Sequence, residues 1–195
     1  MELLEQITYY SEYVRGFGSA AMLIISLSII MQCHVPMIPF AIVAGVCGYL
    51  FGFQQGIILS WGSVVIGSFI AFNVFHFFKL DKFTDKILSR YKILPKLTDK
   101  FVMGFILVIH NIPAIPIAVP NMVAAISKIS LSRFMTFTAA GLLVPCMLFT
   151  GFGAGVDAFL ASPGIMTFVP ILVIGVFLVL IKLIDVDKVL SRYGL

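Results

Sequence analysis

The stretch CHVPMIPFAIVAGVCGYLFG, residues 33–52, decides the fold, because it is apolar enough for a membrane interior and yet contains a helix break. Pro36 and Pro39 lie inside it, directly after His34. Proline lacks a backbone N–H and disrupts the helical hydrogen-bond ladder. Backbone groups freed at membrane depth need partners in the protein or in a water-filled cavity, since lipid offers none. The stretch therefore predicts a chain that turns within the bilayer.

The composition of the whole chain is that of a membrane protein. Of 195 residues, 61% are hydrophobic and 11% are charged, whereas soluble domains carry roughly 25% charged residues. We therefore expect an all-α integral membrane protein with a single membrane domain over residues 1–195. Residues 1–15 lack the basic start of a signal peptide, so the first apolar segment is expected to remain in the mature protein. The three cysteines have no zinc-site or disulfide spacing and are expected to pack as small apolar residues.

The basic residues predict which parts of the chain face the cytoplasm. Seven of the 13 Lys and Arg lie between Lys79 and Lys100. The others are Arg15, Lys128, Arg133, Lys182, Lys188 and Arg192. We therefore expect the N-terminal segment 1–15, the connector 79–100 and the C-terminal tail 185–195 to be cytoplasmic.

An even number of crossings must separate neighbouring cytoplasmic clusters. Residues 16–78 contain no Lys or Arg and have room for two full spans, about 16–33 and 54–78. Residues 134–181 have room for two more, joined around GAGVDAFLASPG with Asp157 outside. The expected total is about four full transmembrane helices.

Two Pro-broken stretches predict re-entrant hairpins, one at 34–53 and one at 101–127. The second is too short for two crossings and has basic residues on both sides, so it should enter and leave on the cytoplasmic face. HNIPAIP at 110–116 repeats HVPMIP at 34–39, with a constant offset of 77 between the prolines. Because one hairpin enters from outside and the other from inside, we expect an inverted repeat. The alternative is a pair of ordinary Pro-kinked helices.

The connector 79–100 is expected to form an amphipathic cytoplasmic helix. Leu80, Phe83, Ile87 and Tyr91 recur at helical spacing beside basic side chains. This pattern favours a helix that lies in the membrane interface and binds anionic lipid. The alternative is a solvated connector packed against the membrane domain.

Small residues follow the first proline pair. Gly48, Gly52 and Gly56 recur every four residues and predict a smooth ridge on which helix backbones approach closely. GFGAG at 151–155 lacks the full spacing and the preceding strand of a dinucleotide-binding loop, so helix packing is the expected role there too.

Two segments resemble the DedA superfamily, whose core is called the VTT or SNARE-associated Golgi protein domain, and the Golgi-type branch is the closer one. One segment is PMIPFAIVAGVCGYLFGFQQG, beginning at Pro36, and the other is GFILVIHNIPAIPIAVPN, ending at Asn121. The resemblance covers about residues 34–155. It implies two re-entrant hairpins in an inverted repeat. It also implies movement of lipids between leaflets, either phospholipids or a polyprenyl-phosphate carrier, with dependence on the proton-motive force in some members.

The chain departs from the family pattern at its ionisable positions. His110 stands where the family usually has an arginine before the second proline pair, and His76 stands where another arginine is common. The membrane acids thought to serve proton coupling in DedA proper are missing here, since no Asp or Glu lies between Glu12 and Asp81. The resemblance therefore supports the fold more strongly than the mechanism.

Ionisable and polar groups at membrane depth are the candidate site residues. The candidate substrate-binding residues are His34, Pro36, Pro39, His110, Asn111, Pro113, Pro116, Asn121, Lys128 and Arg133. Protonated, His110 could hold a lipid phosphate, and neutral, it could pass a proton. The alternative is a structural histidine bonded to a carbonyl freed by Pro113.

The other candidates also have two interpretations. His34 and His76 join His110 as candidate proton-relay residues, with an interfacial position as the alternative for both. Asn121 could orient a headgroup or cap a broken helix. Lys128 and Arg133 could gather anionic headgroups or simply set the topology.

The sequence predicts a transporter or scramblase that moves a phosphate-headgroup lipid, a phospholipid or a polyprenyl phosphate, between leaflets of the cell membrane. Alternatives are a transporter of a small ion or solute and a non-transporting membrane scaffold. No HExxH or GxSxG motif and no Asp-rich cluster is present, so an enzyme is not expected. Membrane lipids, anionic ones above all, are the expected partners. We expect no cofactor, metal or nucleic acid, and a homo-oligomer is compatible with the sequence.

Overall fold

The structure, a computed structural model, describes residues 2–35, 38–78, 99–112, 115–127 and 129–161. The helices are α1 (Glu2–Gly16), α2 (Ser19–Gln32), α3 (Phe40–Phe77), α5 (Asp99–Ile109), α6 (Ala118–Ile126) and α7 (Leu131–Ala161). Within the described ranges the fold contains no strand. The expected all-helical class is therefore confirmed for this part of the chain.

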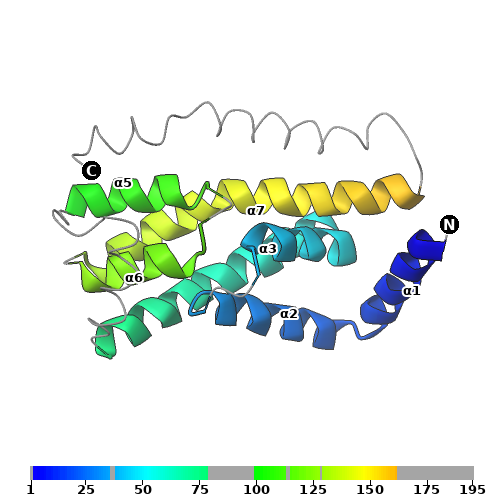
Figure 1. Cartoon of the computed structure of the whole chain (residues 1–195), viewed down its shortest axis with the longest axis horizontal. Helices are drawn as coiled ribbons and strands as arrows, with labels where there is room; N and C mark the ends of the chain where they lie inside the picture. Colours follow the sequence, from blue (N-terminus) through cyan, green and yellow to red (C-terminus); the bar gives the residue numbers. More distant parts are fainter. Residues whose placement is uncertain (1, 36–37, 79–98, 113–114, 128, 162–195) are drawn as a thin grey trace.

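α3 is two helices joined at Gly52 rather than one continuous helix. Gly52 has φ 76° and ψ 178°, a backbone conformation essentially restricted to glycine. A methyl group on Gly56 would lie 2.9 Å from the carbonyl oxygen of Cys47, whereas residues this far apart in a straight helix are separated by about 13 Å. The chain therefore folds back at Gly52, so that 40–51 runs one way and 53–77 runs the other (Figure 1).

Replacement of Gly52 by alanine is expected to destabilise the protein by about 1–3 kcal/mol, because an L-residue is strained at this backbone conformation. Space is not the cause, since nothing lies within 4 Å of an added Cβ. Gly62 is the matched control, because it is helical and equally open. Gly62→Ala should leave stability unchanged or raise it by up to about 1 kcal/mol. Thermal unfolding in detergent measures both, and equal midpoints for the two variants would contradict this account of the break.

Two pairs of short helices point toward the middle of the molecule from opposite ends (Figure 1). One pair is α2 and the helix 40–51, and the other is α5 and α6. α2, α5 and α6 contain 14, 11 and 9 residues, which corresponds to about 21, 17 and 14 Å. Each helix is therefore shorter than the roughly 30 Å hydrocarbon core of a bilayer.

The first Pro-broken stretch has boundaries that differ from the prediction. Residues 34–53 supply a turn and one returning helix, and the opposing arm is α2, which lies in the expected full span 16–33. α2 is too short to cross a membrane alone, and it meets α1 at an angle of 101°. Because α2 is uniformly apolar, the sequence pattern cannot separate a half-span arm from a full span. The second predicted stretch, 101–127, contains most of α5 and all of α6.

Among the described residues, two stretches are long and apolar enough to cross a membrane: Leu131–Ala158 and Phe40–Phe77, which the reversal at Gly52 divides into 40–51 and the longer helix 53–77. α1 with α2 would be a third span if the bent pair counts as one. α7 continues to Ala161, so the chain does not turn within GAGVDAFLA as expected. Its predicted partner span lies beyond residue 161, outside the described residues. The connector at 79–98 and the tail 185–195 also lie outside them.

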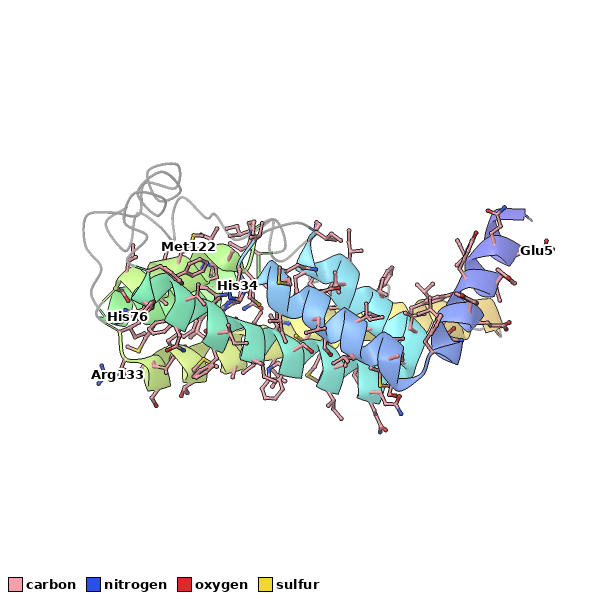
Figure 2. All side chains as sticks on the ribbon, turned by 90° about the horizontal axis from the view of Figure 1, so that it is seen from below. Glu5, His34, His76, Met122 and Arg133 are labelled. Carbon is pink, nitrogen blue, oxygen red and sulfur yellow. The ribbon has the colours of Figure 1, made fainter. Side chains whose placement is uncertain are left out.

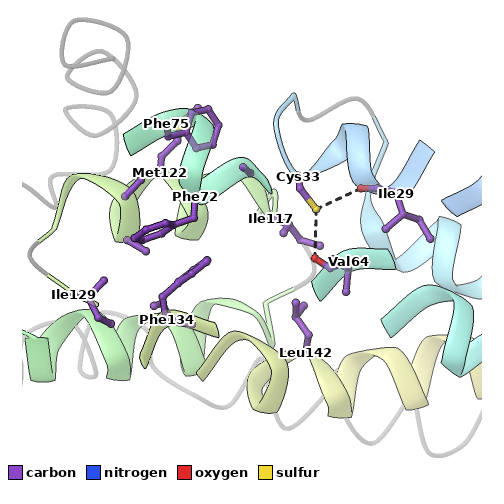
Figure 3. Packing of buried hydrophobic residues seen from close by; sticks show 14 of the residues in the cluster. Ile29, Cys33, Val64, Phe72, Phe75, Ile117, Met122, Ile129, Phe134 and Leu142 are labelled. Atoms are coloured by element: carbon purple, nitrogen blue, oxygen red, sulfur yellow. Dashed lines mark hydrogen bonds between the residues drawn. The ribbon is translucent and has the colours of Figure 1, made fainter. Parts of the chain in front are cut away.

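The core lies between α3 and α7. Val64, Phe134 and Leu142 are fully buried there, and the rings of Phe72 and Phe134 stack at 4.8 Å (Figure 3). Cys33 adds a thiol that donates to the carbonyl oxygen of Val64 at 3.7 Å. The cysteines are therefore buried packing residues, as expected.

Part of the predicted glycine ridge forms the closest helix contact. A methyl group on Gly48 would overlap the carbonyl of Thr150 in α7, and one on Gly153 would overlap the carbonyl of Gly45. Close packing is therefore confirmed for Gly48. Gly52 does not take part in this contact, because its backbone conformation is where the chain reverses direction.

An ion pair corrects the predicted topology. Arg15 Nη2 lies 2.6 Å from Asp157 Oδ1, and the same guanidinium donates to the carbonyls of Tyr49 and Leu50 at 2.6 and 3.0 Å. The prediction of a cytoplasmic Arg15 together with an external Asp157 is therefore wrong, because residues in contact lie on one face of a membrane. A single arginine is weak support for sidedness, and here its charge is already balanced by Asp157.

Candidate functional site

The two pairs of short helices meet at their tips through one asparagine. The Asn121 Nδ2 group in α6 donates to the carbonyl oxygen of Cys33, just after α2, at 3.1 Å. Asn121 is fully buried. α6 begins after Ile117 with no side-chain cap, so Asn121 does not cap its own helix, and the carbonyl that it reaches belongs to Cys33, the C-cap residue of α2. The amide of Asn121 thus links the two tips.

His110 follows the last residue of α5 and is buried, with 8% of its surface exposed. Neither ring nitrogen has a hydrogen-bond partner. The interpretation of His110 as a structural histidine bonded to a freed carbonyl is therefore not supported. The ring lies against α7, where a methyl group on Gly141 would be 3.3 Å from Nδ1. Glycine at 141 thus leaves room for the imidazole.

A proline in α7 frees a carbonyl beside this histidine. Pro145 lies inside the helix and has no N–H to donate to the carbonyl of Gly141 four residues earlier. Asn111 Nδ2 donates to that carbonyl at 3.5 Å and to the carbonyl of Leu107 at 2.8 Å. Asn111 therefore donates to a carbonyl near the end of α5 and to the carbonyl that Pro145 leaves without a helical partner in α7.

Four buried polar atoms in the described residues have no hydrogen-bond partner. They are Nδ1 and Nε2 of His110, Oδ1 of Asn121 and Oγ1 of Thr138. Burial of a polar group without a partner costs about 1–3 kcal/mol by protein mutational data. All come from α6, α7 or the turn after α5. Each unpartnered buried polar group in a folded protein requires an explanation, and a bound ligand or ion is one such explanation.

The remaining tip residues have local roles in this structure. His34 Nδ1 donates to the carbonyl of Ile30 at 3.0 Å. Pro39 is exposed and is the residue before α3. Its carbonyl accepts from Ile42 N, and that of Pro116 accepts from Val119 N, each at 3.0 Å. Pro36, Pro113 and Lys128 lie outside the described residues.

His76 and Arg133 lie together at one end of the molecule, away from Glu5 at the other end (Figure 2). His76 Nδ1 donates to the carbonyl of Ala125, near the end of α6, at 3.1 Å. Its ring stacks on Phe72 at 6.0 Å. His34 and His76 thus bond to backbone carbonyls rather than to another histidine, and the relay of three histidines stays a prediction.

Two residues of the site were missed by the sequence analysis. In the sequence, Thr138 is a small residue within an apolar stretch, and Gly141 resembles a residue that allows close helix packing. Pro145 is the signal that could have found Gly141, because an intramembrane proline marks the freed carbonyl four residues before it, whereas no such signal points to Thr138. No group of His, Cys, Asp or Glu that could hold a metal ion occurs among the residues that the structure describes.

The helices and this polar centre define an all-helical membrane protein of transporter-like architecture. The chain belongs to the VTT domain family of the DedA superfamily, whose profile matches residues 38–155. It is 26% identical over 174 residues to the uncharacterized membrane protein YhjE of Bacillus subtilis strain 168, covering 88% of this chain and 82% of that protein. No solved structure matches the chain.

Proposed function

We propose that the protein moves a phosphate-headgroup lipid between the two leaflets of the cell membrane, with membrane lipids as its partners. The observation that carries this proposal is the group of unpartnered polar atoms of His110, Asn121 and Thr138 in an apolar protein. A site for a neutral apolar ligand would have no need of them. A phospholipid has a polar headgroup and apolar acyl chains. A small polar site in an apolar membrane protein can bind the headgroup while the acyl chains stay in the surrounding lipid.

The helix pairs act in this proposal as two re-entrant hairpins of an inverted repeat. Their arms are too short to cross a bilayer. The two pairs extend from opposite ends of the molecule toward its middle, where their tips meet (Figure 1). The returning arms, 40–51 and α6, both begin at the tips. Helix N-termini carry partial positive charge, so two of them face the centre and favour an anion there.

The tips must separate for a headgroup to enter, because His110 and Asn121 are buried. Separation breaks the bond between Asn121 and the carbonyl of Cys33. Asn121 Nδ2 is then free to donate to a phosphate oxygen. His110 meets water at the same moment, takes up a proton and donates to the phosphate as a cation. Closure of the tips expels that proton and the headgroup together, which links transport to protons.

Replacement of His110 by alanine is expected to slow leaflet exchange at least several-fold, because the cationic donor is lost. Proteoliposomes holding the purified protein and a fluorescent phospholipid, with and without a pH gradient, measure the rate. Asn73→Ala serves as the control, since Asn73 is exposed and bonds within its own helix to the carbonyl of Phe69. It should leave the exchange rate unchanged.

Exchange by the wild type no faster than in empty liposomes would overturn the proposal. Uptake of soluble inorganic phosphate in the absence of lipid exchange would assign the same centre to a small solute instead. Unchanged lipid exchange in His110→Ala would remove the histidine from the mechanism while leaving lipid movement intact.

We also propose a role for the basic residues that follow the second helix pair, α5 and α6. Arg133 is exposed at the start of α7, and Lys128 precedes it in the sequence. We assign them to the cytoplasmic mouth, where they attract anionic headgroups. The C-terminal tail 185–195 is assigned to the same face by its basic residues.

A further inference from the structure

α1 carries an apolar stripe that is exposed in the described structure over most of its length. Ile7, Tyr10, Val14 and Phe17 recur at spacings of three and four residues, which places them on one face of a helix. Ile7, Tyr10 and Phe17 are 41%, 64% and 53% exposed. The opposite face carries Glu5 and Glu12, both exposed.

The direction of α1 relative to α2 fits the plane of a membrane surface. α2 exposes Leu23, Ile24, Leu27 and Met31, so it presents an apolar side to lipid. α1 meets α2 at an angle of 101°, so if α2 enters the bilayer, α1 runs along its surface. The exposed rings of Tyr9 and Tyr13 flank the stripe, and tyrosine is enriched where the headgroups meet the acyl chains.

The charges on α1 decide which lipid it fits. Glu2, Glu5 and Glu12 outnumber Arg15, the one basic residue of the helix, and Arg15 is paired with Asp157. An interfacial helix that binds anionic lipid needs Lys and Arg on its polar face. α1 has the opposite balance, so a leaflet of zwitterionic lipid suits it and an anionic one repels it.

The position of α1 in the fold indicates which leaflet of the membrane the helix contacts. α1 lies at one end of the molecule, and the end of α3 and the start of α5 lie at the other (Figure 1). The last two flank the connector that holds seven of the 13 basic residues, so the positive-inside rule places that end in the cytoplasm. α1 is therefore at the external leaflet.

We propose that α1 is an interfacial helix that binds the zwitterionic external leaflet, with Ile7, Tyr10 and Phe17 in the acyl-chain boundary and Glu5 and Glu12 in water. The guanidinium of Arg15 joins α1 to the end of the helix 40–51. It bonds there to the carbonyls of Tyr49 and Leu50 and pairs with Asp157. The N-terminus is then external, and the surface helix marks the level at which α2 enters the bilayer.

Depth measurements on two faces of the helix test the binding. Tyr10→Cys and Glu12→Cys, each in the full chain, are labelled with an environment-sensitive fluorophore and reconstituted in phosphatidylcholine liposomes at low protein density. The three native cysteines are buried, and the unmutated chain reports their background labelling. We expect nitroxide-labelled lipid to quench the label at 10 several-fold more than the label at 12, and aqueous iodide to quench them in the reverse order.

Three results would overturn the proposal. Equal iodide quenching of both labels would place α1 in water. Protection of position 10 from both quenchers would show that protein covers the stripe, whether a second copy or residues of the same chain. Stronger lipid quenching in phosphatidylglycerol than in phosphatidylcholine vesicles would contradict the charge argument.

Sidedness is tested in intact cells with a membrane-impermeant thiol reagent. Glu5→Cys should react without permeabilisation, whereas Lys82→Cys in the connector should react only after it. Reaction of Glu5→Cys only after permeabilisation would overturn the external assignment. Neither experiment depends on lipid exchange, so the inference stands or falls separately from the proposed function.

Discussion

Replacement of Gly48 by alanine is expected to destabilise the folded protein strongly. A methyl group at this position would overlap the backbone carbonyl of Thr150. Backbone atoms cannot rotate out of the way as a side chain can, so the helix 40–51 and α7 must move apart. Overpacking of this kind costs about 1–3 kcal/mol or more, a large part of the stability of a typical domain. The yield of monodisperse protein and its unfolding midpoint in detergent measure the loss.

Gly45 supplies the matched control on the same helix. A methyl group there would lie 3.7 Å from the carbonyl of Phe149, which is ordinary van der Waals contact. Gly45→Ala should therefore be tolerated, while Gly153→Ala, which would overlap the carbonyl of Gly45, should fail like Gly48→Ala. Similar unfolding midpoints for all three variants would show that the two helices are not packed backbone to backbone.

Replacement of Asn121 by leucine is expected to release the two tips from each other. Leucine fills a similar volume but cannot donate to the carbonyl of Cys33, which Asn121 reaches at 3.1 Å. Loss of the bond leaves a buried carbonyl unpaired, at a cost of roughly 1–3 kcal/mol. The closed arrangement is weakened more than the open one, because only the closed one contains the bond. We therefore expect a lower unfolding midpoint and tips that separate more readily, while the headgroup loses the donor that Asn121 would supply to it.

A distance measurement makes the Asn121 prediction independent of the proposed function. Spin labels at Ile38 and Ile115, one on each tip, should give a broader and longer distance distribution in Asn121→Leu than in the wild type. Asn73→Ala is the control, since Asn73 is exposed and bonds within its own helix to the carbonyl of Phe69. An unchanged tip-to-tip distance in Asn121→Leu would refute the role of Asn121 as the link.

Local chemistry made several features of this protein predictable. The low charge content indicates a membrane, and the proline pairs mark the turns, because proline removes a donor wherever it stands. Most of α5 and all of α6 fall within the predicted range 101–127 for this reason. His110 was also predictable as a site residue, since an ionisable group in an apolar run is costly unless it serves a function.

Contacts between distant residues decided the rest. Nothing in the apolar run of α2 distinguishes an arm of about 21 Å from a full span, and only its junction with α1 and its contact with the tip of α6 reveal the arm. The pairing of Arg15 with Asp157 joins residues 142 positions apart, and it brings together two side chains that the sequence analysis assigned to opposite faces of the membrane. The shared environment of His110, Asn111 and Gly141 likewise depends on how α5 packs on α7.

The sequence by itself determined the membrane class, the family and the places where the backbone breaks, because composition and proline act locally and need no partner. Only the tertiary structure decided which helices pair across those breaks, which glycines touch backbone and which polar atoms remain unpartnered. Each of these depends on the positions of two or more segments far apart in the chain, and an apolar residue looks the same in sequence whether it faces lipid or another helix.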